Sequence, residues 1–185
     1  MYQDNLIRTF PNAFSDEFCD NLIKKFEDAA TKDKQRFSDT GVNFTQLNFR
    51  ESNWEKEQTD MVHIFVEHAK KYAKSVGVTN EWPMKYALED IRMKKYNPND
   101  HDEFQAHVDV GDNRNCTRFL VFFVYLDDNE KGGTTFPKLK HSVECKKGTM
   151  LMFPPMWTHV HAGEKPIIKP KYMVGSYLHY VGQDL

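Results

Sequence analysis

The sequence lacks an excess of charge of either sign. Its 25 Lys and Arg nearly balance its 27 Asp and Glu, which leaves a formal net charge of −2 at pH 7. Basic and acidic residues are interspersed, as in residues 22–37. A protein that holds nucleic acid by its phosphates usually shows a basic excess or a basic run. The balance therefore argues against nucleic acid as a partner.

The sequence also lacks a long hydrophobic run. Its longest apolar stretch, Phe119–Leu126, is far shorter than the roughly 20 residues that a membrane-spanning helix needs. Residues 1–10 contain no basic region followed by an apolar stretch, which is the pattern of a secretory signal. We therefore expect a soluble, cytoplasmic protein without a membrane partner.

Cysteine is scarce. Cys19, Cys116 and Cys145 are far apart and form no Cys-x-x-Cys pair. This excludes the common sequence patterns of structural zinc sites and of dithiol redox sites. Separated cysteines in odd number are typical of an intracellular protein with reduced thiols.

Aromatic residues are plentiful, with 14 Phe, 8 Tyr and 3 Trp among 185 residues. Disordered chains are poor in such residues, and this length suffices for one domain with a sizeable core. The sequence shows no internal repeat and no low-complexity segment. We interpret residues 1–185 as a single domain, with residues 1–80 as mainly helical support and residues 81–185 as its core.

The first part of the chain has helical periodicity. Ser15 is a candidate N-cap for a helix over residues 16–30, and apolar residues at helical spacing predict a second helix over 59–75, before Gly77. The polar segment 36–58 lies between them. We interpret it as a loop near a functional site or as a disordered connection, and nothing in the segment decides between the two.

From Glu89 onward the pattern is one of short strands separated by turn residues. Such strands at close spacing predict an antiparallel sandwich or barrel. The predicted strands cover residues 90–97, 104–110, 117–126, 133–137, 142–146, 149–154 and 171–181.

One of these strands carries a possible metal-binding pair, His107 and Asp109. Residues two apart in a strand face the same side, so the imidazole and the carboxylate could bind one ion. The signal is weak by itself, because a surface ion pair would have the same spacing. Residues 101–103 offer a competing His-x-Glu pair.

Two residues further along the chain, His161 and Lys171, support a metal site. His161 follows a Pro-Pro turn, and Lys171 comes ten residues later at the start of the last strand. Two histidines and one carboxylate around an ion leave coordination positions open, which suits non-haem Fe(II) and oxygen chemistry. A lysine at the mouth of a barrel would supply a charge for a carboxylate. His159 has the same strand parity as His161 and is an alternative third ligand.

With these residues, the sequence resembles the Fe(II)- and 2-oxoglutarate-dependent dioxygenases, in particular the prolyl 4-hydroxylase branch. The resemblance covers residues 89–181, with a weaker similarity at residues 10–26. The matching pieces occur in the family's order: KKYNP with Tyr96, HVD, TRFLVFFVYLDD, GGTTF, KGTMLMFPP, HAG and Lys171. The resemblance implies an α+β fold, a double-stranded β-helix (a jelly-roll or cupin-like barrel) buttressed by N-terminal helices.

The resemblance also implies ligands and cofactors. His107, Asp109 and His161 would bind Fe(II), and Lys171 would pair with the distal carboxylate of 2-oxoglutarate. O2 would be the second co-substrate, and ascorbate is left open as an accessory factor. No catalytic residue beyond the metal ligands is implied.

Further roles follow from the same resemblance. Thr135 and Tyr96 would donate hydrogen bonds to 2-oxoglutarate, and Arg118 and His179 match positions that contact peptide substrate in prolyl 4-hydroxylases. A strand-end ion pair is an equally good interpretation of Arg118.

The chain departs from the family pattern at two positions. Phe104 stands where the family often has tyrosine, and Tyr177 where the branch often has tryptophan. The segment between Tyr96 and His107 is also slightly longer than usual. These departures leave the iron site intact but weaken the case for peptidyl proline as the substrate.

The implied activity is hydroxylation of a C–H bond, foremost of proline in a peptide or protein, with release of succinate and CO2. The alternatives are the same chemistry on a free amino acid or another small molecule, and a barrel that holds a metal such as Zn(II) without turnover. An oxygenase for nucleic acid bases is disfavoured by the charge balance, and by Lys171, where those relatives usually have arginine.

Overall fold

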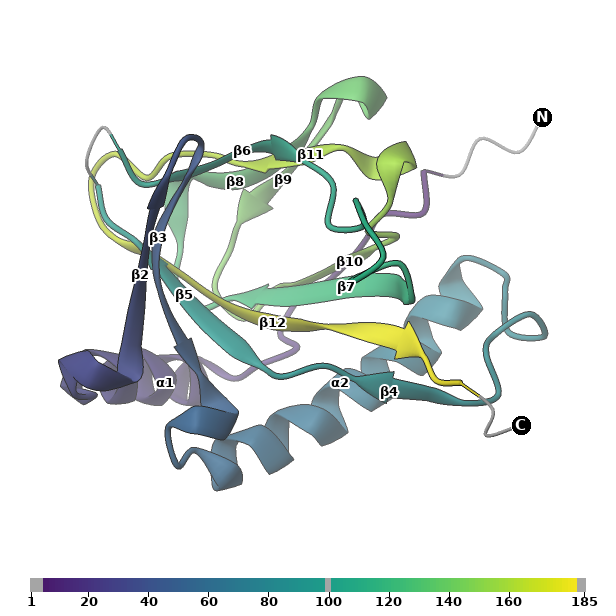
Figure 1. Cartoon of the computed structure of the whole chain (residues 1–185), viewed down its shortest axis with the longest axis horizontal. Helices are drawn as coiled ribbons and strands as arrows, with labels where there is room; N and C mark the ends of the chain where they lie inside the picture. The colour runs from purple at the N-terminus through teal and green to yellow at the C-terminus, as the bar shows by residue number, and fades with distance from the viewer. Residues whose placement is uncertain (1–4, 99–100, 183–185) are drawn as a thin grey trace.

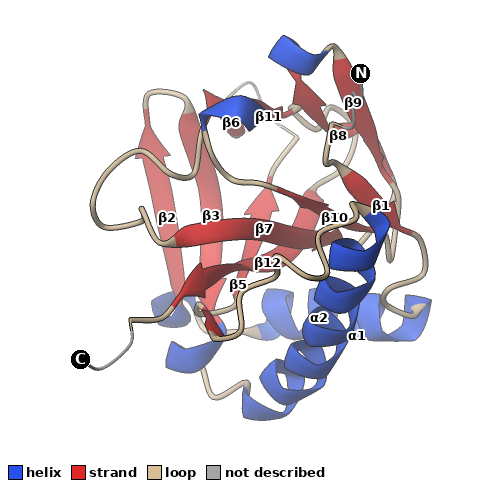
Figure 2. Ribbon diagram, turned by 90° about the vertical axis from the view of Figure 1, so that its right-hand side faces the viewer, coloured by secondary structure: helices blue, strands red, loops and turns tan. Residues whose placement is uncertain are grey.

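The computed structural model, which describes residues 5–98 and 101–182, shows one curled antiparallel sheet with two helices against its outside (Figures 1 and 2). The helices are α1 (Asp16–Asp28) and α2 (Glu55–Ser75). The strands are β1 (Arg8–Phe10), β2 (Lys34–Asp39), β3 (Val42–Asn48), β4 (Tyr86–Leu88), β5 (Arg92–Tyr96), β6 (Glu103–His107), β7 (Arg118–Tyr125), β8 (Asn129–Phe136), β9 (His141–Cys145), β10 (Met150–Phe153), β11 (His161–Gly163) and β12 (Lys171–Tyr180).

Both predicted helices are present. The Ser15 hydroxyl accepts a hydrogen bond from the Phe18 backbone N–H at 3.2 Å, so it is the N-cap that the sequence predicts. Helix α2 begins at Glu55, four residues earlier than predicted, and two acidic residues occupy its first turn. Negative charge there is favourable because it faces the positive end of the helix dipole. Within the described part of the chain, no helix is long and apolar enough to cross a membrane.

The prediction of an unstructured connection over residues 36–58 is wrong. Most of this segment forms the hairpin of β2 and β3, which turns at Gly41 with a left-handed φ of 76°. Phe37 and Phe44 are opposite each other in the hairpin, with ring centroids 4.9 Å apart. Such a cross-strand aromatic pair stabilises a hairpin whose other side chains are largely polar.

The sheet follows the order β1-β10-β7-β12-β5-β3-β6-β11-β8-β9, with β2 added beside β3 and β4 beside β12. Its antiparallel pairing and the two helices agree with the predicted α+β class and barrel. Strands β1, β2 and β3 come from the part of the chain expected to be mainly helical support. The N-terminal segment therefore contributes to the barrel wall as well as covering it.

Alternation along β7 separates two hydrophobic cores. Phe122 and Val124 point outward and pack in a cluster with residues of α1 and α2. Phe123 and Tyr125 point inward, into a second cluster that fills part of the barrel. The two helices lie together on the outer side of β7, β12 and β5 (Figure 2). The inner face of the same strands is left to line cavities.

Candidate active site

Three residues that could hold a metal ion meet inside the barrel. His107 is the last residue of β6, Asp109 follows two residues later, and His161 is the first residue of β11, which pairs with β6. The Asp109 carboxylate lies 3.6 Å from His107 Nε2 and 3.5 Å from His161 Nε2. One ligand atom from each residue lies within 4.8 Å of the others.

Backbone carbonyls fix the orientation of both imidazoles. The Nδ1 of His107 donates to the Gln105 carbonyl at 2.7 Å, and the Nδ1 of His161 donates to the His159 carbonyl at 3.0 Å. Each Nε2 then carries the lone pair that a metal needs.

Two buried polar atoms in this cluster, His107 Nε2 and Asp109 Oδ2, have no hydrogen-bond partner in the described part of the chain. Buried polar atoms are rarely left unpaired in folded proteins. These two therefore fit a site that is completed by a bound metal ion.

The electrostatics of the cluster keep its ligands in the protonation states that bind metal. Burial alone would raise the pKa of Asp109, but the neighbouring imidazoles of His107 and His161 and the Tyr177 hydroxyl lower it below its ordinary value. Burial lowers the pKa of His161 to about 4. At neutral pH the cluster therefore offers an ionised carboxylate and a neutral His161.

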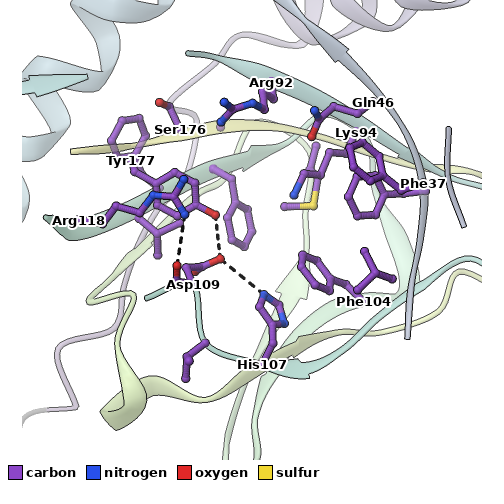
Figure 3. A pocket seen from close by; sticks show the side chains of 18 residues that line it. Phe37, Gln46, Arg92, Lys94, Phe104, His107, Asp109, Arg118, Ser176 and Tyr177 are labelled. Atoms are coloured by element: carbon purple, nitrogen blue, oxygen red, sulfur yellow. Dashed lines mark hydrogen bonds and ion pairs between the residues drawn. The ribbon is translucent and has the colours of Figure 1, made fainter. Parts of the chain in front are cut away.

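Both departures from the family pattern touch this cluster. The Tyr177 hydroxyl donates to Asp109 Oδ1 at 2.8 Å, and the Phe104 ring stacks on His107 with centroids 3.6 Å apart. Arg118 donates to the Asp109 backbone carbonyl at 3.2 Å, and its guanidinium lies 3.9 Å from the Tyr177 ring centroid (Figure 3). The sequence signalled Tyr177 and Phe104 only as deviations, without a contact to the metal ligands.

A small cavity of about 50 Å³ lies on one side of the cluster, and Lys171, Tyr96 and Thr134 line it. Lys171 is 1% exposed, and its Nζ donates to the Gly133 carbonyl at 3.4 Å. That Nζ lies 5.3 Å from the Tyr96 ring centroid. Burial lowers the pKa of Lys171 to about 8. The cavity therefore ends in a cation that the protein leaves without a carboxylate partner among its described residues.

Thr135, for which the sequence predicts a hydrogen bond to 2-oxoglutarate, is not among the residues that line this cavity. Neighbouring residues of a strand point to opposite faces, and here Thr134 is the inward one. Thr134 is buried and shares a hydrogen bond of 2.7 Å with the Tyr125 hydroxyl. The sequence motif contains two consecutive threonines, and the register of β8 selects the first of them.

A larger cavity of about 430 Å³ shares His107 and Asp109 with the small one as lining residues (Figure 3). This volume is within the usual range of small-ligand sites. Arg118 lines the cavity, and Glu89 holds its guanidinium with contacts of 2.6 and 2.7 Å. His179 pairs with Arg118 across β12 and β7 but is not among the residues that line the cavity.

The competing candidates have structural partners. The His159 Nε2 donates to the Asn5 carbonyl at 2.7 Å, and its Nδ1 bonds to the Thr158 hydroxyl. In the competing His-x-Glu pair, the Glu103 carboxylate lies 3.3 Å from Lys165 Nζ and accepts a hydrogen bond from the Gln105 amide at 3.0 Å. Asp102, between the two residues of that pair, is fully buried and receives two hydrogen bonds from the Arg36 guanidinium, at 2.6 and 3.0 Å. The geometry therefore favours His161 and Asp109 for the metal.

A family model described as the 2OG-Fe(II) oxygenase superfamily matches residues 91–179, a span that contains the whole cluster and Lys171. Residues 91–179, slightly less than half of the chain, are thus similar to this superfamily. The match and the metal-binding cluster together support a 2-oxoglutarate-dependent oxygenase that uses Fe(II) and 2-oxoglutarate. No curated protein sequence matches the chain.

Solved structures share the fold, which is the double-stranded β-helix of these oxygenases. The viral collagen prolyl hydroxylase from Paramecium Bursaria Chlorella virus-1, in complex with 2OG, has 22% identity and a TM-score of 0.71, over 95% of this chain and 97% of that one. A Pseudomonas putida prolyl-4-hydroxylase has 13% identity and a TM-score of 0.67, over 95% and 93%. The alpha ketoglutarate dependent carbocyclase SnoK from nogalamycin biosynthesis has 10% identity and a TM-score of 0.71, over 97% and 84%.

Proposed function

We propose that the protein hydroxylates a C–H bond of a proline-containing substrate and converts 2-oxoglutarate to succinate and CO2. The observation that carries the proposal is that His107 and Asp109 line both cavities, while His161 lines the small one. The small cavity ends at Lys171, and the large one opens beside Arg118. A co-substrate in the small cavity and a substrate in the large one could thus reach the same metal ion.

In this proposal the three residues bind the iron, which supplies the oxygen chemistry when it is bound. Lys171 pairs with the distal carboxylate of 2-oxoglutarate, and Tyr96 and Thr134 line the same cavity. A charge-assisted contact of this kind contributes about 1.5–3 kcal/mol. The carbonyls that hold His107 and His161 fix the coordinating nitrogens before the metal arrives.

Two observations make proline our first candidate for the substrate. Two of the structures that share the fold over nearly the whole chain are named as prolyl hydroxylases. Arg118 stands at a position that contacts peptide in that branch, and here it is held at the cavity by Glu89. A free amino acid or another small molecule is the second candidate. It is favoured by the size of the large cavity and by the fold shared with SnoK.

The direct test measures 2-oxoglutarate turnover with proline-containing peptides, free amino acids and oligonucleotides. We expect Asp109→Ala and His161→Ala to abolish succinate formation, whereas His63→Ala, on the exposed face of α2, leaves it unchanged. Normal turnover in both ligand variants would refute the site. Metal binding without succinate formation by the unaltered protein would favour a non-catalytic barrel. Turnover stimulated only by oligonucleotides would refute the substrate class.

A further inference from the structure

Lys94 is a cation inside the barrel that the proposed site does not use. It lies on β5, opposite Met173 of β12, and it lines both the small and the large cavity. Its side chain lies between Arg118 on one side and Phe37 of the hairpin on the other (Figure 3). Lys94 therefore faces the same space as the metal-binding cluster.

The Lys94 ammonium has no anionic partner in the described part of the chain. Its contacts are with two aromatic faces, the Phe44 ring at 4.6 Å and the Phe104 ring at 5.1 Å from Nζ. No hydrogen bond or ion pair joins it to a described residue. The adjacent Lys95, whose side chain is on the outer face, binds the Glu27 carboxylate at 2.9 Å.

The other charges of the cavity are already paired. Arg118 is held by Glu89 in a two-contact ion pair, and Arg92 lies 3.8 Å from the same carboxylate. Asp109 accepts the Tyr177 hydroxyl and faces both imidazoles of the cluster. A bound metal would take up its charge. Lys94 and Lys171 are thus the two cavity cations without an ion pair among the described residues, and of these two only Lys94 lines the large cavity.

Keeping an ammonium group away from bulk water without a partner is costly. Burial lowers the pKa of Lys94 to about 8, and the group is still mostly charged at neutral pH. Methionine or leucine would fill the same position without that cost. A cation retained at such a place is typical of a site whose anion arrives with a ligand.

The register of β5 and β12 separates Lys94 from the co-substrate end of the barrel. Lys171 is opposite Tyr96, whereas Lys94 is opposite Met173, two residues further along both strands. Beyond Lys94, the neighbours on this inner face are Gln46 and Arg92, which line the large cavity only. Lys94 therefore stands where the two cavities meet, on the side where a substrate would enter.

We propose that Lys94 binds a carboxylate group of the substrate that is oxidised, so that the preferred substrates carry a carboxylate close to the reacting carbon. The inference rests on the proposed function, since it names the substrate class of the same site. The carboxylate has three possible sources: a free amino acid, the C-terminus of a peptide, and an acidic side chain beside the proline.

The first experiment measures binding without turnover. The protein is loaded with Zn(II) and 2-oxoglutarate, and calorimetry compares matched acids and amides. The pairs are N-acetylproline against N-acetylprolinamide, Gly-Pro-Ala as free acid against its C-terminal amide, and Gly-Pro-Glu amide against Gly-Pro-Gln amide. We expect the acid of at least one pair to bind about tenfold or more tightly than its amide, as a charge-assisted contact predicts. If no acid binds more tightly than its amide, the inference is wrong.

The second experiment assigns the preference to Lys94. We expect Lys94→Met to reduce the acid-to-amide ratio to about one, and Lys94→Arg to keep most of it. Lys95→Met is the matched control and should keep the full ratio, because its side chain lies outside the barrel. An unchanged ratio in Lys94→Met overturns the inference. The inference is also overturned if Lys94→Met and Lys171→Met lose the same amount of 2-oxoglutarate affinity, because Lys94 would then bind the co-substrate.

These outcomes separate the inference from the proposed function. If proline peptides give no succinate but the acids still bind through Lys94, proline is the wrong substrate and the carboxylate is the right class. If proline peptides are hydroxylated equally well as acids and amides, the proposed function is correct and the role of Lys94 is refuted.

Discussion

Replacing Lys171 by methionine should make the ligand-free protein more stable and weaken the binding of 2-oxoglutarate. Lys171 is 1% exposed, and its only hydrogen bond among described residues is a long one to the Gly133 carbonyl. Burial lowers its pKa from 10.5 to about 8, so the protein holds a cation in a place that disfavours charge. Methionine retains the length and the apolar stem and removes the charge.

The size of the effect follows from the pKa. The difference between 10.5 and about 8, at roughly 1.36 kcal/mol per pH unit, is about 3 kcal/mol of folding free energy at neutral pH. For a chain of this length, each kcal/mol changes the melting temperature by roughly 2–4 °C. Lys171→Met should therefore melt roughly 6–12 °C higher than the unaltered protein.

The dependence on pH has a definite sign. The folded protein releases the Lys171 proton at about pH 8, and the unfolded chain does so near 10.5. Between these values the unfolded chain binds more protons, so raising the pH stabilises the folded form. Below pH 8 both forms are protonated and the full penalty remains. The difference in stability between Lys171→Met and the unaltered protein should shrink from pH 8 to pH 10.5.

The assay is chemical denaturation of the metal-free protein, followed by thermal shifts of the Zn(II)-loaded protein with 2-oxoglutarate. A ligand at 100 times its Kd stabilises a protein by about 2.7 kcal/mol, and Lys171→Met should lose most of this gain. Lys169→Met is the control, because Lys169 forms an exposed ion pair with Asp127. A variant that is less stable than the unaltered protein without ligand, or equally stabilised by 2-oxoglutarate, would refute the reasoning.

Three further predictions concern the metal cluster and its neighbours. Tyr177→Phe removes the hydroxyl that donates to Asp109. It should weaken metal binding about 10–100-fold in a competition titration, because such supporting hydrogen bonds orient ligands. In the metal-free protein, unfolding free energy should fall by up to about 3 kcal/mol between pH 6.5 and pH 4, because the unfolded chain protonates His161 at about 6.5 and the folded one only at about 4. His161→Gln should show a flatter pH profile in urea denaturation. Arg36→Met should cost roughly 3 kcal/mol in the same assay, because it removes both guanidinium hydrogen bonds to the buried Asp102 carboxylate, yet metal affinity should be unchanged.

The sequence predicted most of the elements that position the site. Alternation along residues 171–181 predicted that Lys171, Tyr177 and His179 share one face of a strand. In β12, Lys171 and Tyr177 do face the interior of the barrel. His107, Asp109 and His161 are brought together by the pairing of β6 with β11. This pairing joins residues far apart in the chain, and only the order of motifs indicated it.

Other features depend on register and packing that one sequence does not reveal. Either threonine of the GGTTF segment could have faced the co-substrate, and a shift of one residue exchanges them. The hairpin of β2 and β3 was missed because its apolar residues are few and its strands are otherwise polar. Lys94 lies in the strand predicted over residues 90–97. A strand pattern, however, does not show whether a lysine contacts a carboxylate or an aromatic ring.

Two lysines inside the barrel lower the stability of the ligand-free protein and also offer charges for anionic ligands. Lys94 and Lys171 both face the interior, both have a pKa lowered to about 8 by burial, and neither has a carboxylate partner among the described residues. Each also disfavours the other, because the charge of Lys171 lowers the pKa of Lys94. A dicarboxylate bound at Lys171 would remove that repulsion and leave Lys94 as the open cation beside the metal. If 2-oxoglutarate binds at Lys171 and a substrate carboxylate binds at Lys94, as proposed, each anion should stabilise the folded protein by pairing with a buried cation.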